Sequence, residues 1–126
     1  MRIFKLRTFA RFARQESIGD RALAKAIREA ESGLVAADLG SGLIKLRIAR
    51  PGSGKRGGYR TIVVYRAGSR AVFLFGFAKS DLDNIAPDRL EDLKALGVDL
   101  LARTGVEMDE AVAAGAVQEV EYGEAD

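Results

Sequence analysis

The apolar residues of the N-terminal segment recur at intervals of three and four positions, which is the spacing of an amphipathic helix. Phe9 and Phe12 begin one such stripe, and residues 20–31 carry a longer one. Gly33 follows the second stripe and favours the end of a helix. We therefore predict a helical hairpin, preceded by a short strand over residues 3–8, where apolar and basic side chains alternate.

The middle of the chain changes to a period of two, which predicts strands. Three such segments, residues 42–50, 59–66 and 70–78, follow one another with no helical stretch between them. Consecutive strands with short connections indicate an antiparallel meander. The connection between the first two strands, residues 51–58, is rich in glycine, so we predict a loop there.

Helical spacing returns in the last third of the chain. Pro87 is favoured in the first turn of a helix predicted over residues 89–102. A weaker helix is predicted over residues 107–114, and residues 116–122 alternate like a short strand. The elements indicate an α+β fold, in which helices pack on one face of a small antiparallel sheet.

Length and composition narrow the possible chemistry. The chain has 126 residues, enough for one domain. It has no histidine and no cysteine, which excludes imidazole acid–base catalysis, thiol nucleophiles and disulfides. An enzyme of this composition must move protons with Lys, Arg, Tyr, Asp or Glu. The longest apolar run, residues 71–75, is far short of the roughly 20 residues of a membrane helix, so we expect a cytoplasmic protein without a membrane partner.

Charge is distributed unevenly along the chain. Residues 1–79 hold 17 Lys and Arg against 5 Asp and Glu, a net charge of +12. Residues 80–126 hold 3 against 13, a net charge of −10. Clustered basic residues are typical of a protein that binds a nucleic acid. The alternative interpretation is that the two parts neutralise each other within the fold.

The glycine-rich segment over residues 51–58 superficially resembles a phosphate-binding loop. A P-loop needs a fixed glycine spacing followed by a helix, whereas Gly54 and Lys55 precede two more glycines and a strand. Nucleotide hydrolysis is therefore not indicated. The segment can be a plain hairpin connection, or a basic loop whose glycines allow close approach to a nucleic-acid backbone.

Basic residues also lie within the predicted strands. Lys45 and Arg47 are two residues apart and share one strand face. Arg60 and Arg66 also share a face, with apolar residues between them. Either these two arginines lie at the ends of a buried face or a bulge intervenes. A solvated sheet edge is the alternative interpretation for each arginine alone.

The third strand ends with an aromatic and a cation. Phe77 shares its face with Lys79 and is a candidate for stacking on a nucleobase. An acidic run follows, and paired carboxylates can bind Mg²⁺, although helix N-terminal charges on a solvated face explain it better. The acidic residues of this run are Asp81, Asp83, Asp88, Glu91 and Asp92.

Three segments of the sequence resemble the corresponding segments of a known family. The segments are Gly57-Gly58-Tyr59-Arg60-Thr61-Ile62, then Gly76-Phe77-Ala78-Lys79 at the end of an apolar strand, then Asn84-Ile85 before a leucine-rich helix. They resemble the RelE/HigB-like toxins of bacterial type II toxin–antitoxin modules, in the RelE/ParE superfamily. The resemblance covers residues 3–102. We predict a RelE-like domain over residues 1–104, extended by a helix and short strand over residues 105–126.

The resemblance implies a ribosome-dependent mRNA endonuclease that needs no metal or other cofactor. In that chemistry the ribose 2′-OH attacks the adjacent phosphate and leaves a 2′,3′-cyclic phosphate. Arg60 would stabilise the pentavalent phosphate, and Lys79 would act as phosphate clamp or general acid. The base and phosphate-positioning roles fall to Lys55 with Arg56, or to Lys45 with Arg47. Tyr122 is a weak counterpart of the C-terminal tyrosine of some members.

The resemblance also implies partners: a cognate antitoxin, the ribosome and mRNA, with operator DNA bound only through the antitoxin. Two other functions stay open, a non-catalytic RNA- or protein-binding module of the same fold and a ParE-like gyrase inhibitor. Basic residues on strands favour the nuclease over the gyrase inhibitor. The residues predicted to bind RNA or the ribosome are Lys45, Arg47, Arg50, Arg56, Tyr59, Arg66 and Phe77.

Overall fold

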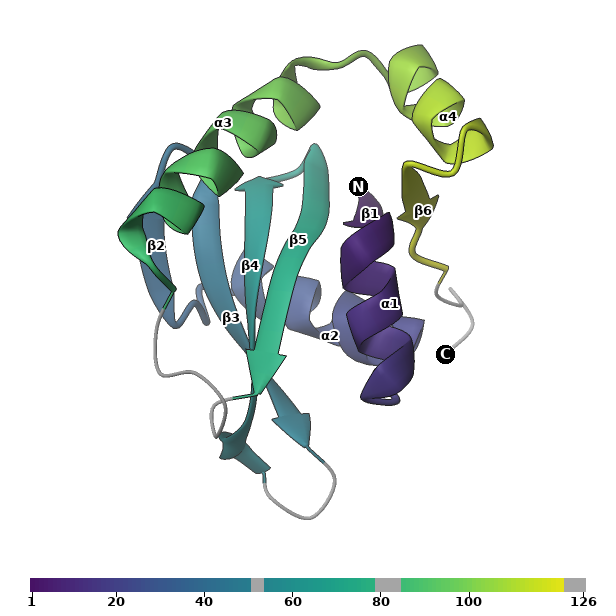
Figure 1. Cartoon of the computed structure of the whole chain (residues 1–126). Coiled ribbons are helices and arrows are strands. Elements are labelled where there is room, and N and C mark those ends of the chain that lie inside the picture. The colour runs from purple at the N-terminus through teal and green to yellow at the C-terminus, as the bar shows by residue number, and fades with distance from the viewer. Residues whose placement is uncertain (51–53, 79–84, 122–126) are drawn as a thin grey trace.

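The computed structural model describes residues 1–50, 54–78 and 85–121 (Figure 1). Within these ranges the chain forms one sheet, and two pairs of helices interrupt the run of strands along the sequence. The elements in chain order are β1 (Arg2–Leu6), α1 (Arg7–Gln15), α2 (Asp20–Glu31), β2 (Ala37–Gly40), β3 (Leu43–Arg50), β4 (Gly54–Arg66), β5 (Arg70–Ala78), α3 (Pro87–Ala102), α4 (Gly105–Ala113) and β6 (Val117–Glu119).

The sheet has the strand order β2-β3-β4-β5-β1-β6. β3, β4 and β5 pair antiparallel, which confirms the predicted meander. β1 adds to β5 in parallel, and β6 pairs antiparallel with β1. β1 and β6 therefore lie side by side at one edge of the sheet, although they are far apart in the sequence.

Helices cover both faces of the sheet, so the prediction that they pack on one face is wrong. α1 and α2 lie against one face, and α3 lies against the other (Figure 1). The reason is visible in β4, where the consecutive residues Ile62, Val63 and Val64 are all buried. Successive side chains of a strand point to opposite faces, so a run of apolar residues needs cover on both sides.

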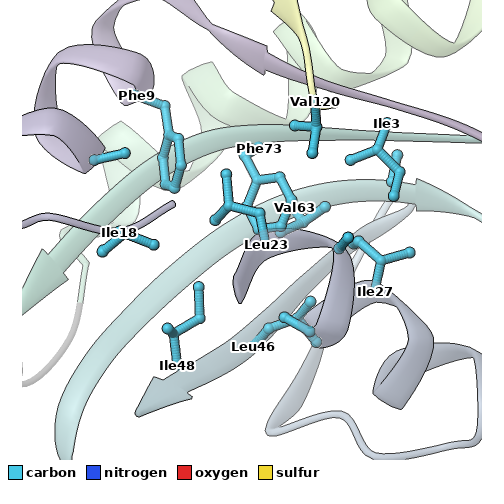
Figure 2. Packing of buried hydrophobic residues seen from close by; sticks show 14 of the residues in the cluster. Ile3, Phe9, Ile18, Leu23, Ile27, Leu46, Ile48, Val63, Phe73 and Val120 are labelled. Carbon is cyan, nitrogen blue, oxygen red and sulfur yellow. The ribbon is translucent and has the colours of Figure 1, made fainter. Parts of the chain in front are cut away.

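The first core lies between the sheet and the pair α1–α2. Leu23 and Ile27 of α2 are fully buried against the strands, and Phe9 of α1 packs with its ring centre 5.2 Å from that of Phe73 (Figure 2). Gly76 lets α1 approach β5 closely, because a Cβ atom there would lie 2.4 Å from the ring of Phe12.

The second core lies under α3. Gly97 faces β3 and β4, and a Cβ atom at this position would lie 2.8 Å from Cγ2 of Val64 and 3.0 Å from Cδ1 of Leu43. The helix therefore packs directly on the strand side chains. α4 contributes the fully buried Met108 to the same core.

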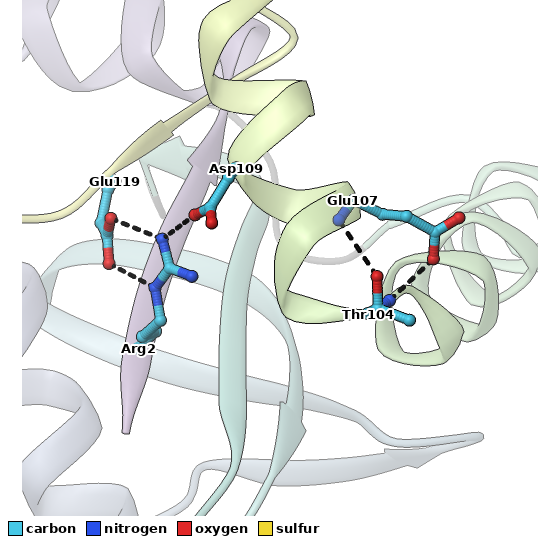
Figure 3. A network of polar contacts seen from close by, with 5 residues as sticks. All are labelled: Arg2, Thr104, Glu107, Asp109 and Glu119. Carbon is cyan, nitrogen blue, oxygen red and sulfur yellow. Dashed lines mark hydrogen bonds and ion pairs between the residues drawn. The ribbon is translucent and has the colours of Figure 1, made fainter.

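Polar contacts hold the C-terminal elements in place (Figure 3). The Thr104 hydroxyl accepts the Glu107 N–H, and the Glu107 carboxylate accepts the Thr104 N–H, which forms a capping box at the start of α4. The Arg2 guanidinium contacts Glu119 at 2.8 Å and Asp109 at 2.7 Å. These ion pairs join β1 to both β6 and α4.

Two further features differ from the sequence prediction. β2 was not predicted, and it pairs with the start of β3. β4 begins at Gly54, so residues 54–58 are strand where a loop was predicted, and residues 51–53 lie outside the described ranges. No helix in the described ranges is long and apolar enough to cross a membrane.

Candidate nucleic-acid interface

Two arginines lie directly opposite each other on neighbouring strands. Arg47 of β3 is the register partner of Arg60 of β4. Side chains of such partners point to the same face of the sheet, with their Cβ atoms roughly 5 Å apart. The face is the one covered by α3. Arg60, Ile62 and Val64 are every second residue of β4 and so share a face, and Ile62 and Val64 belong to the second core.

The two arginines differ in their surroundings. Arg60 is only 6% exposed, whereas Arg47 is exposed to solvent. The pKa of Arg60 is lowered, first by burial and second by the positive charge of Arg47. A buried guanidinium beside a second one is electrostatically unfavourable, and an anion bound between them would relieve the repulsion.

Aromatic side chains lie next to this pair on β5. Phe77 is the register partner of Arg60 on its other side. The rings of Phe77 and Phe75 are 5.9 Å apart between centres, and the guanidinium carbon of Arg89 lies 5.0 Å from the centre of the Phe75 ring. Arg89 belongs to the first turn of α3, so the helix brings a further cation to the edge of the aromatic pair.

We call this region the arginine face. Lys45 belongs to it because it lies two residues before Arg47 on β3, on the same strand face, and is the register partner of Ile62. Cations beside aromatic rings can provide phosphate contacts and stacking surfaces for single-stranded nucleic acid. Phe75 is partly exposed, whereas Phe77 is only 6% exposed. The arginine face consists of Lys45, Arg47, Arg60, Phe75, Phe77 and Arg89.

Tyr59 and Arg50 lie on the opposite side of the sheet. Tyr59 is 2% exposed, and its hydroxyl donates to Oε1 of Glu16 at 2.9 Å. The Phe12 ring meets it edge-on, and the guanidinium carbon of Arg50 lies 5.5 Å from its ring centre. Burial, and then the bond to Glu16, raise the pKa of Tyr59. The structure thus places Tyr59 in contacts that hold α1 to the sheet, and Arg50 beside its ring, away from the arginine face.

Arg66 lies at the far end of β4, about 20 Å along the strand from Arg60. It donates to the Leu101 carbonyl, and its neighbour Arg70 donates to the Leu100 carbonyl at 2.8 Å. Both arginines therefore cap the C-terminal end of α3. Arg60 and Arg66 occupy the two ends of one buried face, which was the first of the two arrangements that their spacing allowed.

The second arrangement, a bulge between Arg60 and Arg66 in β4, is wrong, because the irregularity lies in the neighbouring strand β5. The register between β4 and β5 shifts by one residue between Ile62 and Val63, which leaves Leu74 of β5 without a register partner on β4. The shift aligns Phe75 with Ile62 and Phe77 with Arg60, while Leu74 is buried in the same core as Ile62.

The side chains of four residues named in the sequence analysis lie outside the description. The backbone of Lys55 and Arg56 lies in β4. Lys79 lies outside the described residues, as does Tyr122.

Sequence reasoning missed Phe75 and Arg89. Phe75 could have been found, since it is two residues from Phe77 on the same strand. Arg89 had no such signal, because only the packing of α3 on the sheet brings it to Phe75.

Comparison with known families gives a match over residues 1–120. The matching model describes the RelE toxin of the RelE/RelB toxin–antitoxin system. The chain belongs to the RelE toxin family. The six-stranded, mostly antiparallel sheet with its helices is consistent with a RelE-like fold. Comparisons with curated proteins and with solved structures give no significant match. Membership makes this protein the toxin of a toxin–antitoxin pair, a class that generally inhibits translation, and it implies a cognate antitoxin.

Proposed function

We propose that this RelE toxin is a ribosome-dependent endonuclease that cleaves mRNA on its arginine face. The observation that carries the proposal is the cross-strand pair Arg47–Arg60 with Phe77 on its other side. The pair supplies positive charge for a phosphate. Phe77 is buried and packs beside the partly exposed ring of Phe75, which would supply a stacking surface for a base. The arginine pair is not required by the fold, because like charges placed opposite each other destabilise a sheet.

Arg60 would act on the phosphate that reacts. The 2′-oxygen attacks phosphorus, its proton passes to a base, the bond to the 5′-oxygen breaks, and that oxygen takes up a proton. Negative charge accumulates on the phosphoryl oxygens in the transition state. A guanidinium that is held in a buried, low-dielectric position stabilises this charge more than one in water would.

Arg47 and Lys45 would position the chain of the substrate. Both are nearer the solvent than Arg60, and both lie in line along β3. Phosphates are spaced regularly along RNA, so cations in line on one strand can bind the phosphates that flank the reacting one. Phe75 would contact a base, with the ring of the buried Phe77 packed beside it. We propose the proton-transfer roles for Lys55 and Lys79, on the family resemblance alone.

The proposal is tested by inducing the protein without its antitoxin and mapping new 5′ ends in cellular mRNA. We expect cuts in translated regions in phase with codons, and we expect Arg60→Ala to abolish them. Arg103→Ala, which removes a cation remote from the arginine face, is the matched control and should leave the cuts intact. Growth arrest with intact mRNA and trapped gyrase would refute the nuclease. An absence of toxicity would point to a binding module.

A further inference from the structure

We propose that a nucleobase next to the scissile phosphate of the RNA inserts into an apolar cleft at the free edge of β5, between α1 and α3. The inference rests on the proposed function, because the arginine face has to hold the RNA before a base can reach this cleft. It adds a base-binding subsite to which α1 contributes, although α1 has no part in the arginine face. The cleft would then help to determine which mRNA sequences are cut.

The cleft lies where β5 extends beyond the neighbouring strand β1. β1 ends at Leu6 and pairs with β5 only as far as Phe73, so within the described ranges no strand lies beside residues 74–78 on that side. Among the described residues no main-chain hydrogen bond joins this stretch to α1 or α3. Alternate residues of a strand turn their N–H and C=O groups to the same edge, so the stretch offers a ligand both donors and acceptors.

The walls of the cleft come from both faces of the sheet, because α1 lies on one side of β5 and α3 on the other (Figure 1). Phe12 of α1, Phe75 of β5 and Leu96 of α3 line it, and all three are partly exposed. The cavity has a volume of about 300 Å³. Apolar side chains gathered in a concave, solvent-accessible place are typical of a binding site, and the volume is at the lower end for small-molecule pockets. The size therefore suits a single base.

Charge favours a nucleotide over an apolar occupant. Arg89 is the one charged residue among the described residues that line the cleft, and its guanidinium carbon lies 5.0 Å from the centre of the Phe75 ring. A ring and a cation placed side by side suit a nucleotide, because the ring stacks on the base and the cation pairs with the phosphate. An apolar occupant would bury the guanidinium without a partner, which is unfavourable.

The cleft is within reach of the phosphate that reacts. Phe77 is the register partner of Arg60, and Phe75 lies two residues away along β5, a distance of roughly 7 Å. A nucleotide next to the reacting one can span this distance. Its base would enter the cleft beside Phe75, while Arg89 holds its phosphate at the rim. Thr8 of α1, which is exposed and lines the cleft, adds a hydroxyl that can donate to the base or accept from it.

Titration of the free toxin with nucleotides tests the cleft without the ribosome. The amide signals of Phe75 and Gly76 are followed by NMR while adenosine monophosphate or ribose 5-phosphate is added. We expect adenosine monophosphate to shift both signals and to bind about tenfold more tightly, because it alone has a base that can stack. Equal affinity of the two ligands, or shifts confined to Lys45 and Arg47, would overturn the proposal.

Filling the cleft provides the second arm of the test. Leu96→Trp places a larger ring in the cleft and should lower the affinity for adenosine monophosphate about tenfold. Val98→Trp adds the same ring to α3 at a position that is 55% exposed and does not line the cleft, so it should bind normally. Equal affinity of the two variants would refute the cleft as the base site. The comparison of the two ligands in the wild type decides if Leu96→Trp does not fold.

The distribution of bases at mRNA cut sites connects the cleft to cleavage. One position beside the cut should show an uneven base composition for the wild type and Val98→Trp, and a much more even one for Leu96→Trp. An equal preference in all three proteins would overturn the role of the cleft in sequence choice. Cleavage that persists while adenosine monophosphate does not bind in the cleft would refute the base site alone. Binding in the cleft without mRNA cleavage would refute the nuclease assignment alone.

Discussion

Arg47 and Arg60 lie directly opposite each other across β3 and β4, one exposed and the other only 6% exposed. The proximity of the exposed charge contributes to the lowered pKa of the buried one. Two like charges that face each other destabilise the fold but favour the binding of an anion. Removing one of them should therefore affect stability and anion binding in opposite directions.

Arg47→Ala tests this opposition. Removing one of two facing like charges should leave the free energy of unfolding unchanged or raise it by up to about 1 kcal/mol. The same change removes a charged contact to RNA and should lower mRNA cleavage about tenfold. Urea denaturation and a cleavage assay on the same preparation measure both effects. Parallel losses of stability and cleavage would indicate a structural role for Arg47 instead.

Salt dependence tests the phosphate contacts separately. Binding of the toxin to ribosomes should weaken steeply with salt, because each contact releases counterions. Arg47→Ala and Lys45→Ala should each reduce the slope of log affinity against log salt by about one. Arg103→Ala is the control and should leave the slope unchanged. A slope that does not depend on Arg47 or Lys45 would remove these residues from the interface.

Tyr59→Phe separates the two faces of the sheet. The variant loses the hydrogen bond to Glu16 and should be destabilised by about 1 kcal/mol. Its mRNA cleavage under conditions where it is folded should equal that of the wild type, because the hydroxyl lies on the α1 side. A specific loss of cleavage with normal stability would place Tyr59 back in the site.

This separation was available in the sequence, since adjacent residues of a strand point to opposite faces. Tyr59 and Arg60 could not both face RNA from a regular strand. The meander was predicted correctly because its strands are long and rich in β-branched and aromatic residues. β2 was not, because four residues ending in glycine carry too weak a signal. The place of Arg89 beside Phe75 depends on tertiary packing and has no local pattern.

Gly76→Ala tests the close approach of α1 to β5. The new methyl group would lie 2.4 Å from the Phe12 ring, so the ring or the helix must move. We expect a loss of about 1–3 kcal/mol in the free energy of unfolding. Gly105→Ala is the matched control, because nothing lies within 4 Å of a Cβ atom there. Similar stability of both variants in thermal denaturation would contradict the packing.

The ion pairs of Arg2 should make stability depend on acid pH. Hydrogen bonding by Arg2 holds the pKa of Glu119 below its ordinary value of 4.5. A carboxylate with a lowered pKa in the folded state stabilises the fold above its unfolded pKa and loses that contribution as the pH falls through its folded pKa. The pair is partly exposed, so Arg2→Ala should cost about 1 kcal/mol or less at pH 7.

Denaturation of the wild type and Arg2→Ala at several pH values measures this difference. The stability gap between them should narrow below pH 4.5 and close at lower pH, because Glu119 is then protonated in both. A gap that stays constant down to strongly acid pH would mean that Arg2 acts through packing and not through its charge.

Cleavage of a defined mRNA by the purified toxin, with and without programmed ribosomes, tests the central claim most directly. We predict cleavage only when the mRNA is in the ribosome, a product that ends in a 2′,3′-cyclic phosphate, and loss of the reaction in Arg60→Ala with normal folding. Cleavage of free mRNA at an equal rate, or full activity of Arg60→Ala, would contradict the account.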